Sequence, residues 1–152
     1  MRLGADDLNP AGFQFEDAMS AVGLMKDRGL DLADLSWGFN TDDMEPKPFA
    51  ELAAMVSRAA RVRREIGIPV ATSWNLGLPA VADRVVREGA ADIVMLGRPA
   101  LSNPHWPLWA ARELAHPDPW ALLPEDWAWW LRNFRAHPSC IGWPISDEAG
   151  RN

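Results

Sequence analysis

The sequence contains a single cysteine, Cys140, and no tyrosine. One thiol excludes an internal disulfide framework, and a thiol near the tail without an evident neighbouring base is more often inert than redox-active. No apolar run is long enough to span a membrane, and no charged-then-apolar signal peptide precedes the first expected helix. We therefore expect a cytoplasmic protein.

Positive charge is also scarce. The formal net charge is −6, which argues against a nucleic-acid-binding protein. The 152 residues have the length of one domain, and a hydrophobic fraction of 48% is enough for a core. Nine tryptophans are unusual, and most of them follow Asn103. The C-terminal part therefore differs in composition from the rest.

Short apolar runs alternate with longer amphipathic ones along the first hundred residues. This alternation is typical of βα units and a parallel sheet. The spacing predicts strands at 1–3, 30–36, 68–73 and 91–96, and helices at 15–28, 49–66 and 78–87. Gly29 and Gly89 are expected helix stops, and residues 37–48 are expected to form a loop. The result is four βα units, the first with a truncated strand.

The pattern changes beyond residue 99. A short helix is expected at 107–114, a linker at 116–119, a final helix at 124–135 and a frayed end at 146–152. We divide the chain into residues 1–115 and a Trp-rich extension, 116–152. The extension carries Trp127, Trp129 and Trp130, a stripe more typical of core packing or an oligomer interface than of a cofactor contact.

The most informative stretch is the last expected strand, which runs into Gly97 and Arg98. Glycine lets a ligand approach the backbone closely, and the arginine fork fits phosphate oxygens. Phosphates often bind after the last two strands of an α/β barrel. The alternative is a surface arginine at the end of a strand that binds no ligand. We favour the phosphate site.

Other candidates are weaker. Asp31, Asp34 and Asp92 are better interpreted as strand-start or barrel-polar residues, because no His, Cys or Asp cluster has metal-ligand spacing. Ser36 and Ser73 do not lie in a nucleophile elbow. The arginines between 58 and 64 are interpreted as a solvated helix face.

Four blocks, in this order, resemble the Old Yellow Enzyme family of FMN-dependent ene-reductases. They are Met1-Arg2-Leu3-Gly4-Ala5-Asp6-Asp7, Gly29 through Ser36-Trp37-Gly38, Ile68-Pro69-Val70-Ala71-Thr72, and Gly89 through Gly97-Arg98-Pro99 into Asn103-Pro104-His105-Trp106-Pro107. The resemblance covers most of residues 1–115. It implies the C-terminal half, strands five to eight, of a TIM (β/α)8 barrel, with the tail as an addition.

The resemblance also implies roles for individual residues. Arg2 matches an arginine beside the flavin ring, which stabilises negative charge on the reduced ring. Gly97 and Arg98 match the phosphate-binding pair, and the backbone of 71–73 (Ala71, Thr72, Ser73) matches the other half of that cradle, although the family often has glycine where Ala71 stands. Trp37 and Gly38 match a loop facing the ligand. The implied activity is hydride transfer from NAD(P)H through FMN to an activated alkene.

The departures from the family pattern concern catalysis. The family's first four strands, which supply a substrate-binding histidine pair and a proton-donating tyrosine, have no counterpart here. The histidines, His105, His116 and His137, all follow the last expected strand. We therefore expect an incomplete portion that lacks competence alone and is completed by a second copy or an N-terminal half. The alternatives are a non-catalytic half-barrel that binds FMN or another phosphorylated ligand, and an inactive remnant that associates through its Trp-rich tail.

Overall fold

The computed structural model describes residues 1–38 and 52–133. The chain divides into two compact units, Met1–Ser102 and Asn103–Asn152, and each is described by itself. The expected helix start at 49–51, most of the 37–48 loop, Cys140, His137 and the 146–152 end lie outside the described residues. None of the described helices is long and apolar enough to cross a membrane.

The first unit contains a four-stranded parallel sheet in the order β1-β2-β3-β4. Its strands are β1 (Arg2–Gly4), β2 (Ala33–Ser36), β3 (Val70–Thr72) and β4 (Ile93–Val94). Arg2 pairs with Asp34, which pairs with Ala71, which pairs with Ile93. Because consecutive strands are neighbours and all run the same way, their carboxyl ends lie along one edge of the sheet. This α/β arrangement is compatible with part of a barrel.

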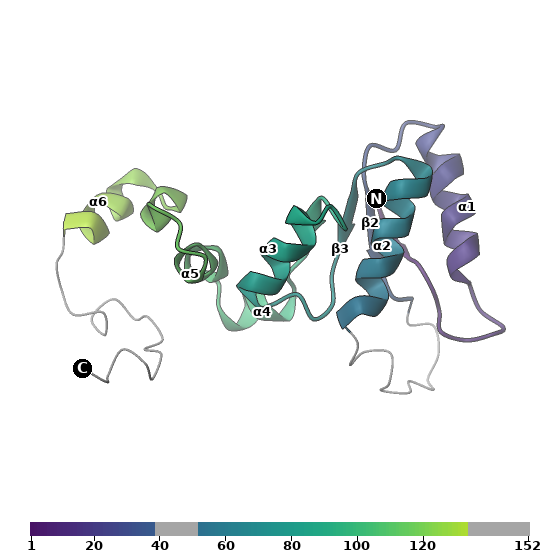
Figure 1. Ribbon diagram of the computed structural model, residues 1–152, viewed down its shortest axis with the longest axis horizontal. Coiled ribbons are helices and arrows are strands. Elements are labelled where there is room, and N and C mark those ends of the chain that lie inside the picture. Colours follow the sequence, from purple (N-terminus) through teal and green to yellow (C-terminus); the bar gives the residue numbers. More distant parts are fainter. Residues whose placement is uncertain (39–51, 134–152) are drawn as a thin grey trace. The chain divides into compact units, whose positions relative to one another are not determined.

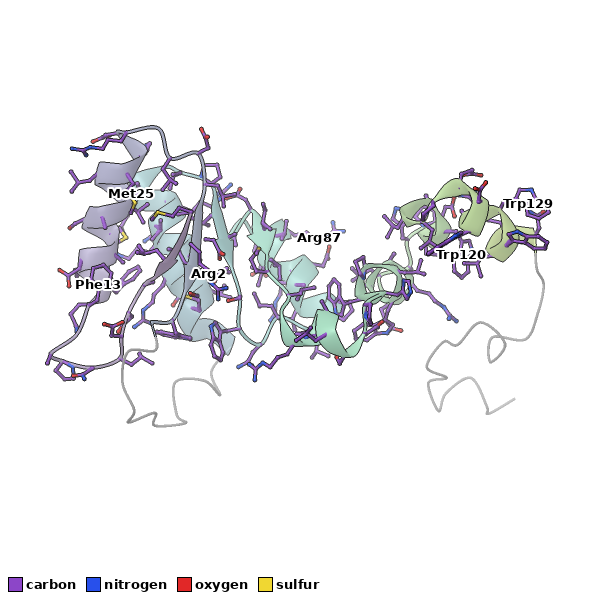
Figure 2. All side chains as sticks on the ribbon, turned by 180° about the vertical axis from the view of Figure 1, so that it is seen from behind. Arg2, Phe13, Met25, Arg87, Trp120 and Trp129 are labelled. Atoms are coloured by element: carbon purple, nitrogen blue, oxygen red, sulfur yellow. The ribbon has the colours of Figure 1, made fainter. Side chains whose placement is uncertain are left out.

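The connecting helices are α1 (Phe15–Lys26), α2 (Leu52–Ile66) and α3 (Pro79–Arg87). Helix α2 packs on α1 and on strands β2 and β3, while α3 packs on β4. Figure 1 shows α2 in front of β2, and the reverse view in Figure 2 shows strands in front of α2, while buried side chains of α1 belong to the same core as Leu35. Helices α1 and α2 therefore cover one face of the sheet.

The two faces of the sheet differ in chemistry. Successive strand residues alternate between faces, so Leu35 and Val70 lie on the helix-covered face, where both are fully buried. Arg2, Asp34 and Ile93 share the other face by register. Ile93 is 45% exposed there. The described helices thus leave the second face of the sheet without a comparable apolar cover.

The core lies between the sheet and helices α1, α2 and α3. The expected period of α1 is confirmed, since Ala18, Met19 and Val22 are buried. The expected stops are confirmed as well. Gly29 has φ +96° and Gly89 has φ +69°, a left-handed conformation that favours glycine at a helix end.

The strands are shorter than the sequence predicts. Residues 30–32 were expected in the second strand but lie before β2. The Leu30 N–H donates a hydrogen bond to the Met25 carbonyl at the end of α1 instead. Only Ile93 and Val94 of the expected strand at 91–96 pair with β3. Residues after Gly97 form an unexpected short helix, α4 (Arg98–Ser102), whose first N–H groups, from Ala100 and Leu101, bond the Gly97 carbonyl.

The second unit is helical. It contains α5 (Trp106–Glu113), a 3₁₀ helix η2 (Pro119–Leu122) that begins at the last residue of the expected linker, and α6 (Glu125–Asn133). Both α5 and α6 contact η2, and Arg132 donates to Asp118 at 2.8 Å. Leu108, Ala110 and Ala128 are buried, whereas Trp127, Trp129 and Trp130 are all more than half exposed. The tryptophan stripe is therefore not a core of the described residues.

We predict that Leu35→Ala destabilises the first unit by about 2–5 kcal/mol, because it opens a cavity in a fully buried position. Urea unfolding followed by circular dichroism measures the loss. Leu24→Ala is the matched control, since Leu24 is 59% exposed on α1 and its truncation leaves no cavity. Equal losses for the two variants would contradict the assignment of the core.

Candidate functional site

Two groups of residues lie at the carboxyl ends of the strands. The first follows β1 and β2 and surrounds a pocket. The second follows β3 and β4 and contains Arg98. In parallel α/β sheets, ligands bind outside the carboxyl ends of the strands, so both groups lie where a ligand is expected.

The pocket at the ends of β1 and β2 has a volume of about 530 Å³. It is lined by Arg2, Leu3, Gly4, Asp7, Phe13, Ser36, Trp37 and Gly38. One cation, one carboxylate and two aromatic rings thus converge on a space large enough for a small organic molecule.

Arg2 brings positive charge to this pocket. Its Nε donates to Ser36 Oγ at 3.2 Å and lies 3.9 Å from Asp34 Oδ2. The side chain is nevertheless 66% exposed, and Figure 2 shows it on the side of the sheet away from α1 and α2. The serine and the aspartate orient the guanidinium and leave most of its surface open to a ligand.

The turn after β1 is held by two buried carboxylates. Asp6 accepts from the Leu8 N–H at 2.8 Å, and Asp7 accepts from the Phe13 N–H at 2.9 Å. Residues 6–12 form a turn that is closed by these bonds and by the Gly12 N–H, which donates to the Asn9 carbonyl. Asp7 therefore faces the pocket as part of a fixed turn.

Close backbone contact joins the two loops that line the pocket. A Cβ on Gly4 would lie 2.9 Å from the Cα of Gly38, and a Cβ on Gly38 would overlap the Asp7 carboxylate. Both positions require glycine for this reason. Gly38, predicted to face a ligand, thus lines the pocket while packing against the first loop.

Arg58 corrects the expectation that the arginines of α2 form a solvated face. Its Nη2 donates to Asp6 Oδ2 at 2.8 Å, and its guanidinium lies 4.8 Å from the Trp37 ring centroid. Arg61, Arg63 and Arg64 do form ion pairs near the surface, with Glu16, Asp92 and Glu65. A single member of the run was thus misassigned, because spacing alone does not show which loop reaches a helix.

The second group begins with a strained turn after β3. Trp74 has φ +75° and Asn75 has φ +52°, which non-glycine residues rarely adopt and which cluster at functional sites. The Arg98 guanidinium lies over the Trp74 ring at 5.4 Å. A Cβ on Gly77 would approach Pro99 to 2.8 Å, so the segment after β3 is in close contact with the start of α4. The structure therefore brings Arg98 beside the turn that follows Ser73.

Gly97 has open space beside it. A Cβ built there meets nothing within 4 Å, and the backbone is not in the left-handed region. The described chain itself therefore gives no steric reason for glycine at this position. Because glycine has no Cβ, it would let an external group come close to the backbone here.

The residues expected beside Arg98 point in different directions. Thr72 is fully buried and its Oγ1 donates to the Leu35 carbonyl at 3.4 Å, so its side chain serves the core. Ala71 shares the Arg2 face by register. Ser73 Oγ is buried and has no hydrogen-bond partner among residues 1–38 and 52–133, so a ligand oxygen can satisfy it.

Asp92 is a structural residue, as the sequence indicated. It accepts from Arg63 Nε at 3.0 Å and from the Val70 N–H at 2.9 Å. These two bonds lower the pKa of the Asp92 carboxyl below its ordinary value, with Arg63 as the larger cause. Within residues 1–38 and 52–133, no group of three His, Cys, Asp or Glu side chains has metal-binding geometry.

Sequence reasoning missed Asp7 and Phe13, which line the pocket, Arg58, which holds the loops behind it, and Trp74 beside Arg98. Position in the chain carried a usable signal for two of them. Asp7 and Trp74 each follow shortly after an expected strand, where ligand-facing residues of parallel sheets lie. Phe13 lies just before α1, and Arg58 lies in the middle of α2. No local sequence pattern marks either residue as part of a site.

This chain is similar to known proteins over 70% to 75% of its length. An NADPH dehydrogenase of Geobacillus thermodenitrificans is 38% identical over 120 residues, and one of Geobacillus sp. (strain WCH70) is 33% identical over 114 residues. Each match covers 75% of this chain and 33% of the relative. An NADH oxidase of Thermoanaerobacter brockii is 28% identical over 109 residues, 70% of this chain and 17% of the relative. No protein-family model matches the sequence. The chain thus spans about a third of the length of the two dehydrogenases.

We predict that the Asp92 interaction makes stability pH-dependent. A carboxyl with a lowered folded-state pKa stabilises the fold above its unfolded pKa of about 4, and this contribution is lost as the pH falls through the folded value. Asp92→Asn is therefore expected to be less stable than the parent at pH 7, and the difference should shrink below about pH 4. Urea midpoints measured across this range test the prediction. A difference that stays constant with pH would contradict it.

Proposed function

We propose that this chain forms the FMN-binding C-terminal half of a TIM-barrel oxidoreductase of the Old Yellow Enzyme type, acting in the cytoplasm. The whole enzyme would transfer hydride from NAD(P)H to an activated alkene, and bound FMN would supply the redox chemistry. The names of the relatives, NADPH dehydrogenase and NADH oxidase, support an NAD(P)H-dependent flavin oxidoreductase. The residues at the strand ends support the assignment of FMN.

The Arg98 group fits a phosphate, and this is the observation that carries the proposal. Arg98 supplies a cation. In the part of the chain that the structure describes, Ser73 Oγ is a buried polar atom without a partner and Gly97 has open space beside it. An arginine fork binds phosphate oxygens through two parallel charge-assisted hydrogen bonds. Trp74 limits the movement of that fork by lying against it. In this proposal Ala71 and Thr72 contribute backbone, since the Thr72 side chain is committed to the core.

The Arg2 pocket fits the flavin ring. Arg2 is oriented by Ser36 and stays largely exposed, while Phe13 and Trp37 provide apolar walls. A fixed cation beside the ring stabilises negative charge that develops on reduction. The two groups lie at the same edge of the sheet, with the ring end at β1 and the phosphate end at β3 and β4.

Catalysis requires more than this chain. The sequence has no tyrosine to donate a proton, and the described histidines, His105 and His116, lie in the second unit. None of the described helices covers the Arg2 face of the sheet as α1 and α2 cover the other face, and exposed sheet edges favour pairing with another chain. We propose that a second copy or an N-terminal half completes the barrel, and that the chain alone binds FMN without alkene reduction.

A second function is favoured by the C-terminal unit. Trp127, Trp129 and Trp130 are exposed on a single helix, and tryptophan is enriched at interface hot spots. These residues support association through the Trp-rich tail, either within the oxidoreductase or in a non-catalytic remnant of it.

We predict that the purified chain binds FMN saturably and that Arg98→Ala weakens binding by roughly tenfold or more, because a charge-assisted phosphate contact is lost. Quenching of flavin fluorescence measures both affinities. Arg87→Ala is the matched control, since Arg87 pairs with Asp83 on the exposed side of α3. Equal weakening by both variants, or no effect of Arg98→Ala, would contradict the phosphate site.

We predict that the chain self-associates and that replacing Trp129 and Trp130 together by Glu shifts it towards monomer. Placing two carboxylates in an apolar contact is unfavourable. Sedimentation velocity at several concentrations measures the shift, with Leu101→Glu, another exposed apolar residue, as control. An unchanged distribution would argue against the tail as the interface. Oxidation of NADPH by the flavin-loaded protein separates a catalytic assembly from a binding remnant.

A further inference from the structure

Arg58 joins both loops that line the Arg2 pocket. It donates to Asp6 of the turn after β1 at 2.8 Å and lies over Trp37, which follows β2, at 4.8 Å. Its guanidinium also lies 5.5 Å from the ring centroid of Phe15, the first residue of α1. One side chain of α2 therefore contacts three separate elements at the strand ends.

This contact set depends on a planar cation. Guanidinium binds a carboxylate and stacks on aromatic rings at the same time, which an ammonium group does not reproduce. Asp6 is only 8% exposed, so its charge needs a partner. Asp6 in turn accepts from the Leu8 N–H, and its backbone carbonyl accepts from the Gly38 N–H at 3.0 Å. The Arg58–Asp6 pair thus connects to the backbone of both loops.

We infer that Arg58 is a positioning residue that holds the Asp6–Asp7 turn and Trp37 in the arrangement that forms the Arg2 pocket. The inference rests on the proposed function for the identity of the ligand, the flavin ring. Arg58 acts through Asp6 and Trp37, because it does not itself line the pocket. It deepens the proposal by assigning control of ring binding to a residue on the helix layer.

Arg61 provides a matched comparison. It is one turn further along α2 and also lies over Phe15, at 5.3 Å. Its ion pairs, however, are with Glu16 and Glu65 near the surface. Arg61→Lys therefore makes the same chemical change on the same helix while leaving Asp6 and Trp37 in place.

Amide hydrogen exchange and lumiflavin titration test the inference on the full chain. Lumiflavin carries the isoalloxazine ring without phosphate, so it probes the ring end alone. We expect Arg58→Lys to speed exchange at Leu8 and Gly38 and to weaken lumiflavin binding, each by roughly tenfold, because an ammonium group cannot pair with Asp6 and stack on Trp37 and Phe15 at the same time. The Asp92 N–H donates to the Val70 carbonyl within the sheet. Its exchange reports global opening and should not change. Asp6→Asn, which weakens the same pair from the other side, should produce the same local pattern.

The outcomes separate the inference from the proposed function. Unchanged exchange at Leu8 and Gly38 in both variants, or equal acceleration in Arg61→Lys, would overturn it. Faster local exchange with unaltered lumiflavin affinity would also overturn it, since Arg58 would then be structural only. If the parent chain binds no lumiflavin, the ring end of the proposed function fails, and the exchange pattern alone decides whether Arg58 positions the two loops.

Discussion

Parallel pairing of β1, β2, β3 and β4 in chain order organises the first unit. The carboxyl ends of all four strands therefore lie along one edge of the sheet, and the loops that follow these strands lie there too. Helices α1 and α2 then cover one face, where Leu35 and Val70 are buried, and leave Arg2 and Asp34 on the other. The location of both residue groups follows from this arrangement before any individual side chain is considered.

The two groups are built by different physical means. Around the pocket, buried carboxylates and glycines fix the loops, since Asp6 and Asp7 bond backbone N–H groups and Gly4 meets Gly38 at close range. In the second group, the strained turn at Trp74 and Asn75 contacts Arg98 at the start of α4. The first group is polar and walled by aromatic rings, whereas the second presents a cation beside open space. This difference suits a ligand with a planar ring at one end and a phosphate at the other.

Most of the first unit was predictable from the sequence, and its limits have physical reasons. Helix α1 follows from the spacing of Ala18, Met19 and Val22, and its end follows from Gly29. Strand lengths were overestimated because pairing partners, rather than apolar runs, set them. Helix α4 was missed because Arg98 and Pro99 read as a strand end. The Gly97–Arg98 pair was predicted from local residues, while the contacts of Arg58 with Asp6 and Trp37 depend on tertiary packing, which no spacing encodes.

The central claim is that the Arg98 group binds a phosphate. The most direct measurement compares the affinity of the full chain for FMN with its affinity for riboflavin, which differ only in the phosphate. We expect FMN to bind at least roughly tenfold more tightly than riboflavin, because the phosphate adds charge-assisted contacts. Equal affinities, or no binding of FMN, would show that the Arg98 group is not a phosphate site.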